Sequence, residues 1–186
     1  MRESDRRVKY TKMVLRESLL KLLEQKPINN ITVTELCQNA DVNRGTFYAH
    51  YSEPFELMKQ IEDELYNDLR DCYERSADMT PESMSRELMA IANQHREICK
   101  ITLGENADQE FVSRIHAMSY EYFKRSWRGS IEKLGIPDDY FYHYLSTGVI
   151  EIVRHWLVSD ENRAPDEVAN IMFKLTSGVI HMCDEK

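Results

Sequence analysis

Apolar residues recur every three or four positions along most of this chain, which is the spacing of one face of an α-helix. Leu15, Leu19, Leu22 and Leu23 form one such stripe, and a longer stripe runs through residues 58–72. Segments that alternate apolar and polar residues, as half-buried strands do, are nearly absent. The sequence therefore predicts an all-α fold.

Capping residues mark where the predicted helices begin. Thr32, three residues before Glu35, has the spacing of a capping box and opens a short helix. Residues 41–43 form a predicted turn, and Asn43 caps a second short helix over residues 44–50. Longer helices are predicted over residues 54–75, 80–103, 108–134, 138–158 and 165–183.

The lengths of these helices divide the chain into two parts. The helices before residue 52 are few and short, whereas those after it are long enough for a bundle. We therefore expect an N-terminal unit over residues 1–52 and a larger helical unit over residues 53–186. The helix that starts at Pro54 would connect them.

Length and composition exclude several classes of protein. The chain has 186 residues, 42% of them hydrophobic, which suffices for a buried core. No uncharged apolar run approaches the ~20 residues of a membrane span, and the first residues are polar and mixed in charge, unlike a secretory signal. We expect a cytoplasmic, nucleoid-associated protein with no membrane partner.

The chemically reactive residues show no arrangement that would indicate catalysis. Cys37, Cys72, Cys99 and Cys183 lie far apart and form no CxxC pair, so we expect reduced thiols. The histidines lack metal-ligand spacing. A nucleophile elbow, a glycine-rich phosphate loop and an HExxH motif are all missing from the sequence. We expect no enzyme activity, no metal and no cofactor.

Charge is distributed unevenly along the chain. Residues 1–51 hold nine Lys/Arg and six Asp/Glu, a net +3, and since the whole chain carries −8, the remainder carries −11. A basic end on an acidic body is typical of proteins that bind nucleic acid through that end.

Two short helices joined by a tight turn are typical of a helix-turn-helix, whose second helix enters the major groove of DNA. At its start, Arg44 can bind guanine through two hydrogen bonds, and Gly45 allows a close backbone approach. Thr46, Tyr48 and His50 can donate to phosphates. Phe47 and Tyr51 fall on the opposite face, as core.

The runs ITVTELC at residues 31–37 and ADVNRGTFYAHY at residues 40–51 resemble the signature of the TetR family of transcriptional regulators. Within that family, the NRGTFYAHY wording is most similar to the dihydroxyacetone-operon regulators. The resemblance implies a homodimer that binds a near-palindromic double-stranded DNA operator, acting as a repressor. The family's DNA-contacting positions correspond here to Thr34, Arg44, Gly45, Thr46, Tyr48 and His50.

The sequence departs from the family pattern at two places. Asp41 stands in the helix-turn-helix turn, where the family often has glycine. Pro54, beside Glu53, stands near the start of the fourth helix, where the family often has a lysine that binds phosphate. The family's usual phosphate contact at that position is therefore missing.

The resemblance also implies a C-terminal region that can bind a small effector, and one aromatic stripe fits such a site. The candidates for ligand binding are His116, Tyr120, Phe123 and Trp127 of that stripe and His95 on the apolar face of the preceding predicted helix. Aromatic and apolar side chains with few polar groups are typical of ligand pockets, but ordinary core packing explains the same stripe, and the sequence leaves both readings open.

The last two predicted helices carry apolar stripes with small residues among them, a pattern that allows close helix packing. The residues expected at a dimer interface are Leu145, Gly148, Val149, Ile152, Trp156, Ile171, Leu175, Gly178 and Val179. A purely intrachain core is the alternative. In place of an effector-controlled repressor, the chain could also be a DNA-bound interaction protein or a coactivator-dependent activator.

Overall fold

The structure is a computed structural model that describes residues 3–104, 108–126, 136–159 and 162–184. The helices are α1 (Glu3–Leu23), α2 (Val33–Asn39), α3 (Arg44–Tyr48), α4 (Pro54–Arg75), α5 (Pro81–Gln94), α6 (Arg96–Thr102), α7 (Gln109–Ser126), α8 (Asp138–Val158) and α9 (Pro165–Asp184). Short 3-10 turns lie at Ile28–Asn30 and Ser76–Asp78. The described residues contain no strand, so the predicted all-α class is confirmed.

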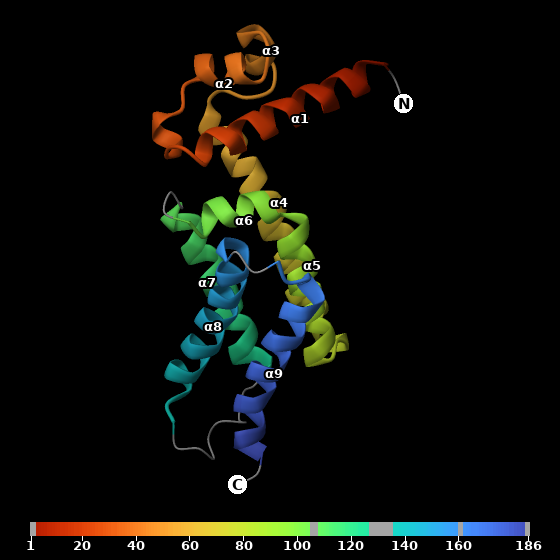
Figure 1. Ribbon diagram of the computed structural model, residues 1–186, viewed down its shortest axis with the longest axis vertical. Helices are drawn as coiled ribbons and strands as arrows, with labels where there is room; N and C mark the ends of the chain where they lie inside the picture. Colours follow the sequence, from red (N-terminus) through yellow and green to blue (C-terminus); the bar gives the residue numbers. More distant parts are fainter. Residues whose placement is uncertain (1–2, 105–107, 127–135, 160–161, 185–186) are drawn as a thin grey trace.

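The helices form a small unit at one end and a larger body at the other (Figure 1). Helices α1, α2 and α3 make up the small unit, and α4 leads from it into the body formed by α5–α9. In the body α9 packs against α5, and α8 packs against α7. Buried apolar residues from Leu15 to Met172 form one continuous core.

The division at residue 52 stays a prediction. None of the helices, within the residues described, is long and apolar enough to cross a membrane.

Helix α4 starts at a well-defined corner. Pro54 occupies its first turn, where the missing N–H of proline costs nothing. The backbone N–H and the hydroxyl of Ser52 donate to Oε2 of Glu56 at 2.6 and 2.8 Å. These two hydrogen bonds stabilise the ionised carboxylate and lower the pKa of Glu56. The corner after α3 is thereby held by a side chain in the first turn of α4.

The predicted helix over residues 80–103 is wrong in one respect, because the structure divides it at His95. The backbone of His95 leaves the helical region at φ −103° and ψ 28°. Its buried ring places Nε2 2.7 Å from Oδ2 of Asp68 on α4. Ile91 and Ile98, on either side of the break, are both buried. The apolar periodicity therefore continues across the kink, and this is why the sequence pattern does not reveal it.

The predicted helix over residues 108–134 matches α7 as far as Ser126. The rest of that prediction, residues 127–134, lies outside the described part of the chain. The predictions for residues 54–75, 138–158 and 165–183 agree with α4, α8 and α9 to within one residue.

A buried carboxylate lies where α4 meets α7. Glu62 is 4% exposed, and its Oε1 has no hydrogen-bond partner among the described residues. The pKa of Glu62 is raised to about 7, first by burial and then by the negative charge of Asp108, with a smaller contribution from Asp63, while Arg114 opposes the shift. Arg114 itself contacts Asp63 at 3.4 Å across the two helices. The folded protein is therefore most stable when Glu62 is protonated.

We predict that Glu62→Gln stabilises the protein at pH 8 and changes little at pH 4.5. In the wild type, stability falls as pH rises from the unfolded-state pKa near 4.5 toward the folded-state value of about 7, because the unfolded chain ionises first. The amide removes this penalty, on the order of 1–2 kcal/mol after allowance for solvent screening. Urea unfolding at both pH values measures the difference in the free energy of unfolding between the variant and the wild type. Glu121→Gln, an exposed change on α7, is the control, and equal pH profiles for the wild type and Glu62→Gln would contradict the assignment.

Candidate functional site

The α2–α3 pair is set by two local caps and one unusual turn residue. Thr32 Oγ1 accepts from the backbone N–H of Glu35 at 3.2 Å, and Asn43 Oδ1 accepts from that of Gly45 at 2.7 Å. Between the two helices, Asp41 has a φ of 52°, the left-handed conformation that a glycine adopts more easily. The chain therefore keeps the turn geometry of a helix-turn-helix with aspartate in the glycine position.

The two faces of α3 differ sharply in exposure. Phe47 is fully buried and Tyr51 is 4% exposed, so both anchor α3 to the core. Arg44 and Thr46 lie on the exposed side, and Tyr48 is 58% exposed. The ring of Tyr48 packs edge-on against Phe47, with centroids 5.6 Å apart. The predicted assignment of core and outer faces is confirmed by these exposures.

The remaining candidates for DNA contact border the same surface. Thr34 on α2 and His50 just after α3 are half-buried. Gly45 is exposed, and an added Cβ would meet only Asn43 Oδ1, at 3.3 Å. On the α2 side, the guanidinium of Arg44 counteracts the burial that raises the pKa of Cys37. Contact of these residues with DNA stays a prediction.

Charges around this surface are partly neutralised within the protein. Lys26 binds both carboxylate oxygens of Glu35 at 2.6 and 2.7 Å. The Glu35 side chain of the predicted capping box is therefore engaged in an ion pair. Arg16 pairs with Glu64 on α4. At the start of α4 Pro54 is buried and flanked by acidic residues. Within the described part of residues 5–60, the cations that pair with no carboxylate are therefore those on the first turns of α1, together with Lys21, Arg44 and Lys59.

The proposed ligand residues in the described part of the chain line neither of the two cavities described below. His95 is bound to Asp68, and the hydroxyl of Tyr120 donates to Oδ1 of Asp139 at 2.8 Å. Phe123 is buried, and His116 is half-buried, with its pKa lowered first by burial and then by His143. Trp127 lies outside the described residues. Their role in ligand binding stays a prediction.

A small cavity lies elsewhere in the body, lined by side chains of α4, α5, α6, α7 and α8. Its volume is about 70 Å³, and its walls include Leu65, Leu88, Ala92 and Ile115. The hydroxyl of Thr102, also on the wall, donates to the carbonyl of Ile98 at 2.9 Å. Among the residues that the structure describes, no charged side chain lines the cavity. Sequence reasoning missed it, because it arises only where five apolar helix faces meet.

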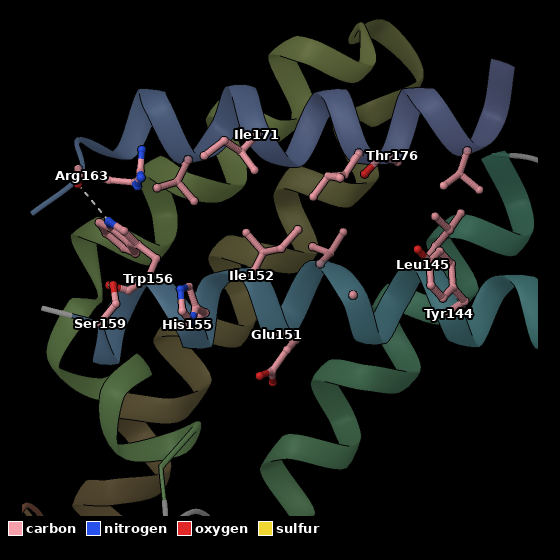
Figure 2. Close-up of a pocket in the computed structure, with 15 residues that line it drawn as sticks. Tyr144, Leu145, Glu151, Ile152, His155, Trp156, Ser159, Arg163, Ile171 and Thr176 are labelled. Carbon is pink, nitrogen blue, oxygen red and sulfur yellow. Dashed lines mark hydrogen bonds between the residues drawn. The ribbon is translucent and has the colours of Figure 1, made fainter. Parts of the chain in front are cut away.

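A wider apolar groove of about 570 Å³ runs between α8 and α9. All the residues expected at a dimer interface line it except Gly178. Figure 2 shows Ile152 and Trp156 of α8 and Ile171 of α9 pointing into the space between the two helices. Trp156 is fixed there by a 3.0 Å hydrogen bond from Nε1 to the carbonyl of Arg163. Leu175 on α9 is 57% exposed.

Comparison with known proteins shows that this chain is similar to transcriptional regulators, both in sequence and in fold. Residues 79–178 match the family of TetR type described as "Transcriptional regulator C-terminal region". The uncharacterized HTH-type transcriptional regulator YxbF of Bacillus subtilis is 19% identical over 170 residues, which cover 88% of this chain. The chain spans only 44% of the length of that relative.

Two solved structures share the fold. The TetR transcriptional regulator of Streptococcus agalactiae superimposes with a TM-score of 0.63 at 22% identity, covering 92% of this chain and 96% of the other. The dihydroxyacetone kinase operon activator DhaS superimposes with a TM-score of 0.55 at 14% identity, covering 92% and 97%. At these identities the likeness concerns the fold alone, and the predicted subgroup stays a prediction. Because the family match spans more than half of the sequence, the chain belongs to the TetR family of transcriptional regulators.

Proposed function

We propose that the chain is a repressor that binds a near-palindromic DNA operator as a homodimer and is released by a small effector. The observation that carries this proposal is the surface of α3. A helix anchored by Phe47 and capped by Asn43 presents Arg44, Thr46 and Tyr48 to solvent. Side chains near the N-terminus of such a helix are those that reach base edges in the major groove.

The size of α3 suits this role. An α-helix with its side chains is about 10–12 Å across, so α3 fits the major groove, which is about 12 Å wide. Arg44, at the first position, has a planar guanidinium that can donate two hydrogen bonds to one guanine. Tyr48, one turn later, is placed to donate to a phosphate and so to fix the register of the helix on the duplex.

We predict that Arg44→Ala and Tyr48→Ala each weaken binding to the DNA upstream of the chain's own gene by about 10- to 100-fold, corresponding to the loss of one base or phosphate contact. Fluorescence anisotropy of a labelled duplex measures the affinity. Arg86→Ala and Tyr140→Ala, exposed positions in the body, are the matched controls and should bind like the wild type. If both α3 variants bound as tightly as the wild type, another surface would have to read the DNA.

The proposed dimer interface rests on the apolar face that α8 and α9 leave uncovered. Ile171 and Leu175 are 39% and 57% exposed, while Val168 and Met172 on the same helix are buried. Nothing within 4 Å would meet a Cβ added at Gly148, so a second helix could approach there closely. Exposed apolar patches of this kind mark association sites. A twofold dimer would also present two copies of α3 to one DNA duplex.

We predict that Leu175→Glu raises the dimer dissociation constant ~100-fold or more, because the interface would bury an unpaired carboxylate. The side chain is exposed in the single chain, so its fold should persist. Sedimentation equilibrium measures the constant. Asn170→Glu places the same charge on α9 outside the groove and should leave the dimer intact. A dimer that tolerates Leu175→Glu would refute this interface.

The proposed effector site is the apolar cavity in the body. An anion there would be desolvated without a partner, since none of the described residues that line the walls is charged. Burial raises the pKa of the Cys99 thiol to about 12, so that wall is neutral as well. The effector, or the part that enters, should therefore be uncharged and apolar. At about 70 Å³ the cavity is roughly half the size of one that binds benzene, so entry would push the helices apart.

We predict that toluene raises the Tm of the wild type and that benzoate does not, because only the neutral ring enters without losing hydration of a charge. Ala92→Leu fills the cavity and should abolish the shift in Tm. Ala90→Leu, on the exposed side of the same helix, should retain it. The cavity would be excluded as the site if benzoate stabilised the wild type equally or if Ala92→Leu kept the full toluene response.

A further inference from the structure

Helix α1 begins well before the small unit that it belongs to. Its first turns run out past α2 and α3 and away from the body (Figure 1). Residues 5–10 are all exposed, and the first fully buried residue of the helix is Leu15. A helical segment with no packing contacts gains little stability of its own. The N-terminal turns of α1 are therefore a projecting arm whose surface is free to bind another molecule.

The arm carries its positive charge in a stripe along one side. Arg6, Lys9 and Lys12 follow each other at intervals of three residues, which places them on neighbouring positions of one helix face. Arg7 lies about 100° around the helix from Arg6 and farther from the other two. Within the described residues none of these four side chains is paired with a carboxylate, whereas Arg16, one turn after Lys12, pairs with Glu64.

The stripe starts beside the proposed reading helix. Nζ of Lys12 lies 5.8 Å from the centre of the Tyr51 ring, and Tyr51 follows α3 by three residues. From there the cations lead outward along the arm. The first turn of α4 offers no cation, since Glu53 and Glu56 flank Pro54. Among the cations of residues 5–60, seven pair with no carboxylate of the described residues: four lie on the arm of α1, and the others are Lys21, Arg44 and Lys59. The arm therefore holds the largest group of them.

We propose that the stripe Arg6–Lys9–Lys12 binds backbone phosphates of the duplex next to the groove that α3 enters. This rests on the DNA-binding function proposed above. The three residues span about 9 Å of helix, at about 1.5 Å per residue. Phosphates of one strand follow each other every ~3.4 Å along the duplex axis, so two or three successive phosphates lie within that span. Their binding releases condensed counterions and strengthens binding at low salt.

Charge removal on and off the stripe tests the proposal on the full-length dimer. Arg6→Gln/Lys9→Gln/Lys12→Gln is compared with Arg7→Gln by fluorescence anisotropy on the duplex from upstream of the chain's own gene, at several salt concentrations. The stripe variant should bind at least about tenfold more weakly near 150 mM salt. The slope of log affinity against log salt should fall by about three or more, since up to six contacts are lost per dimer and each contributes about 0.9. Arg7→Gln should stay within about twofold of the wild type.

Two further readouts separate the outcomes. Far-ultraviolet circular dichroism and urea unfolding establish that the variants fold. If the triple variant does not fold, the double variant Arg6→Gln/Lys9→Gln, which keeps the contact of Lys12 with Tyr51, replaces it in the binding experiment. Amide hydrogen exchange should show protection of residues 5–12 when DNA is bound. A wild type that does not bind DNA overturns both this proposal and the function beneath it. If the wild type binds DNA but the stripe variant shows the same salt slope, the stripe proposal alone is overturned. The same holds if Arg7→Gln loses as much affinity as the stripe variant.

Discussion

The uninterrupted course of α4 is the constraint on which the rest of the structure depends. One helix of 22 residues contacts α1 and the Ile28–Asn30 turn at one end and α5 and α7 in the body. Pro54 and the Ser52–Glu56 hydrogen bonds fix where it starts, a short loop after α3. A displacement of α4 in the body must therefore move the small unit as well, because no break in the helix absorbs it.

The same helix supplies part of the proposed effector site. Leu65, Leu69 and Tyr73 of α4 line the apolar cavity, and Glu62 lies one turn nearer to the small unit. A ligand that needs more room than about 70 Å³ would press on α4 directly. Effector and DNA would then compete through the position of one helix, and the ligand would act only by its different affinity for the two positions.

Local sequence signals predicted the helices and caps of the small unit well, whereas features that depend on the packing of distant segments were missed. The caps at Thr32 and Asn43 and the burial of Phe47 follow from spacing within a few residues, and the structure has them. The residues that the apolar stripes of the last two helices place at a dimer interface line the groove between α8 and α9, except Gly178, and their role in a dimer stays a prediction. The break at His95 escaped notice because both halves bury the same face, and the cavity because it belongs to five helices at once.

The central claim is that two copies of α3 read one duplex from a dimer joined through α8 and α9. Hydroxyl-radical footprinting of the full-length protein on DNA from upstream of its own gene tests this most directly. Two protected stretches should lie on one face of the duplex with centres about one helical turn, or ~34 Å, apart, and both should disappear together with Leu175→Glu. A single protected stretch, or a paired footprint that survives Leu175→Glu, would contradict the account.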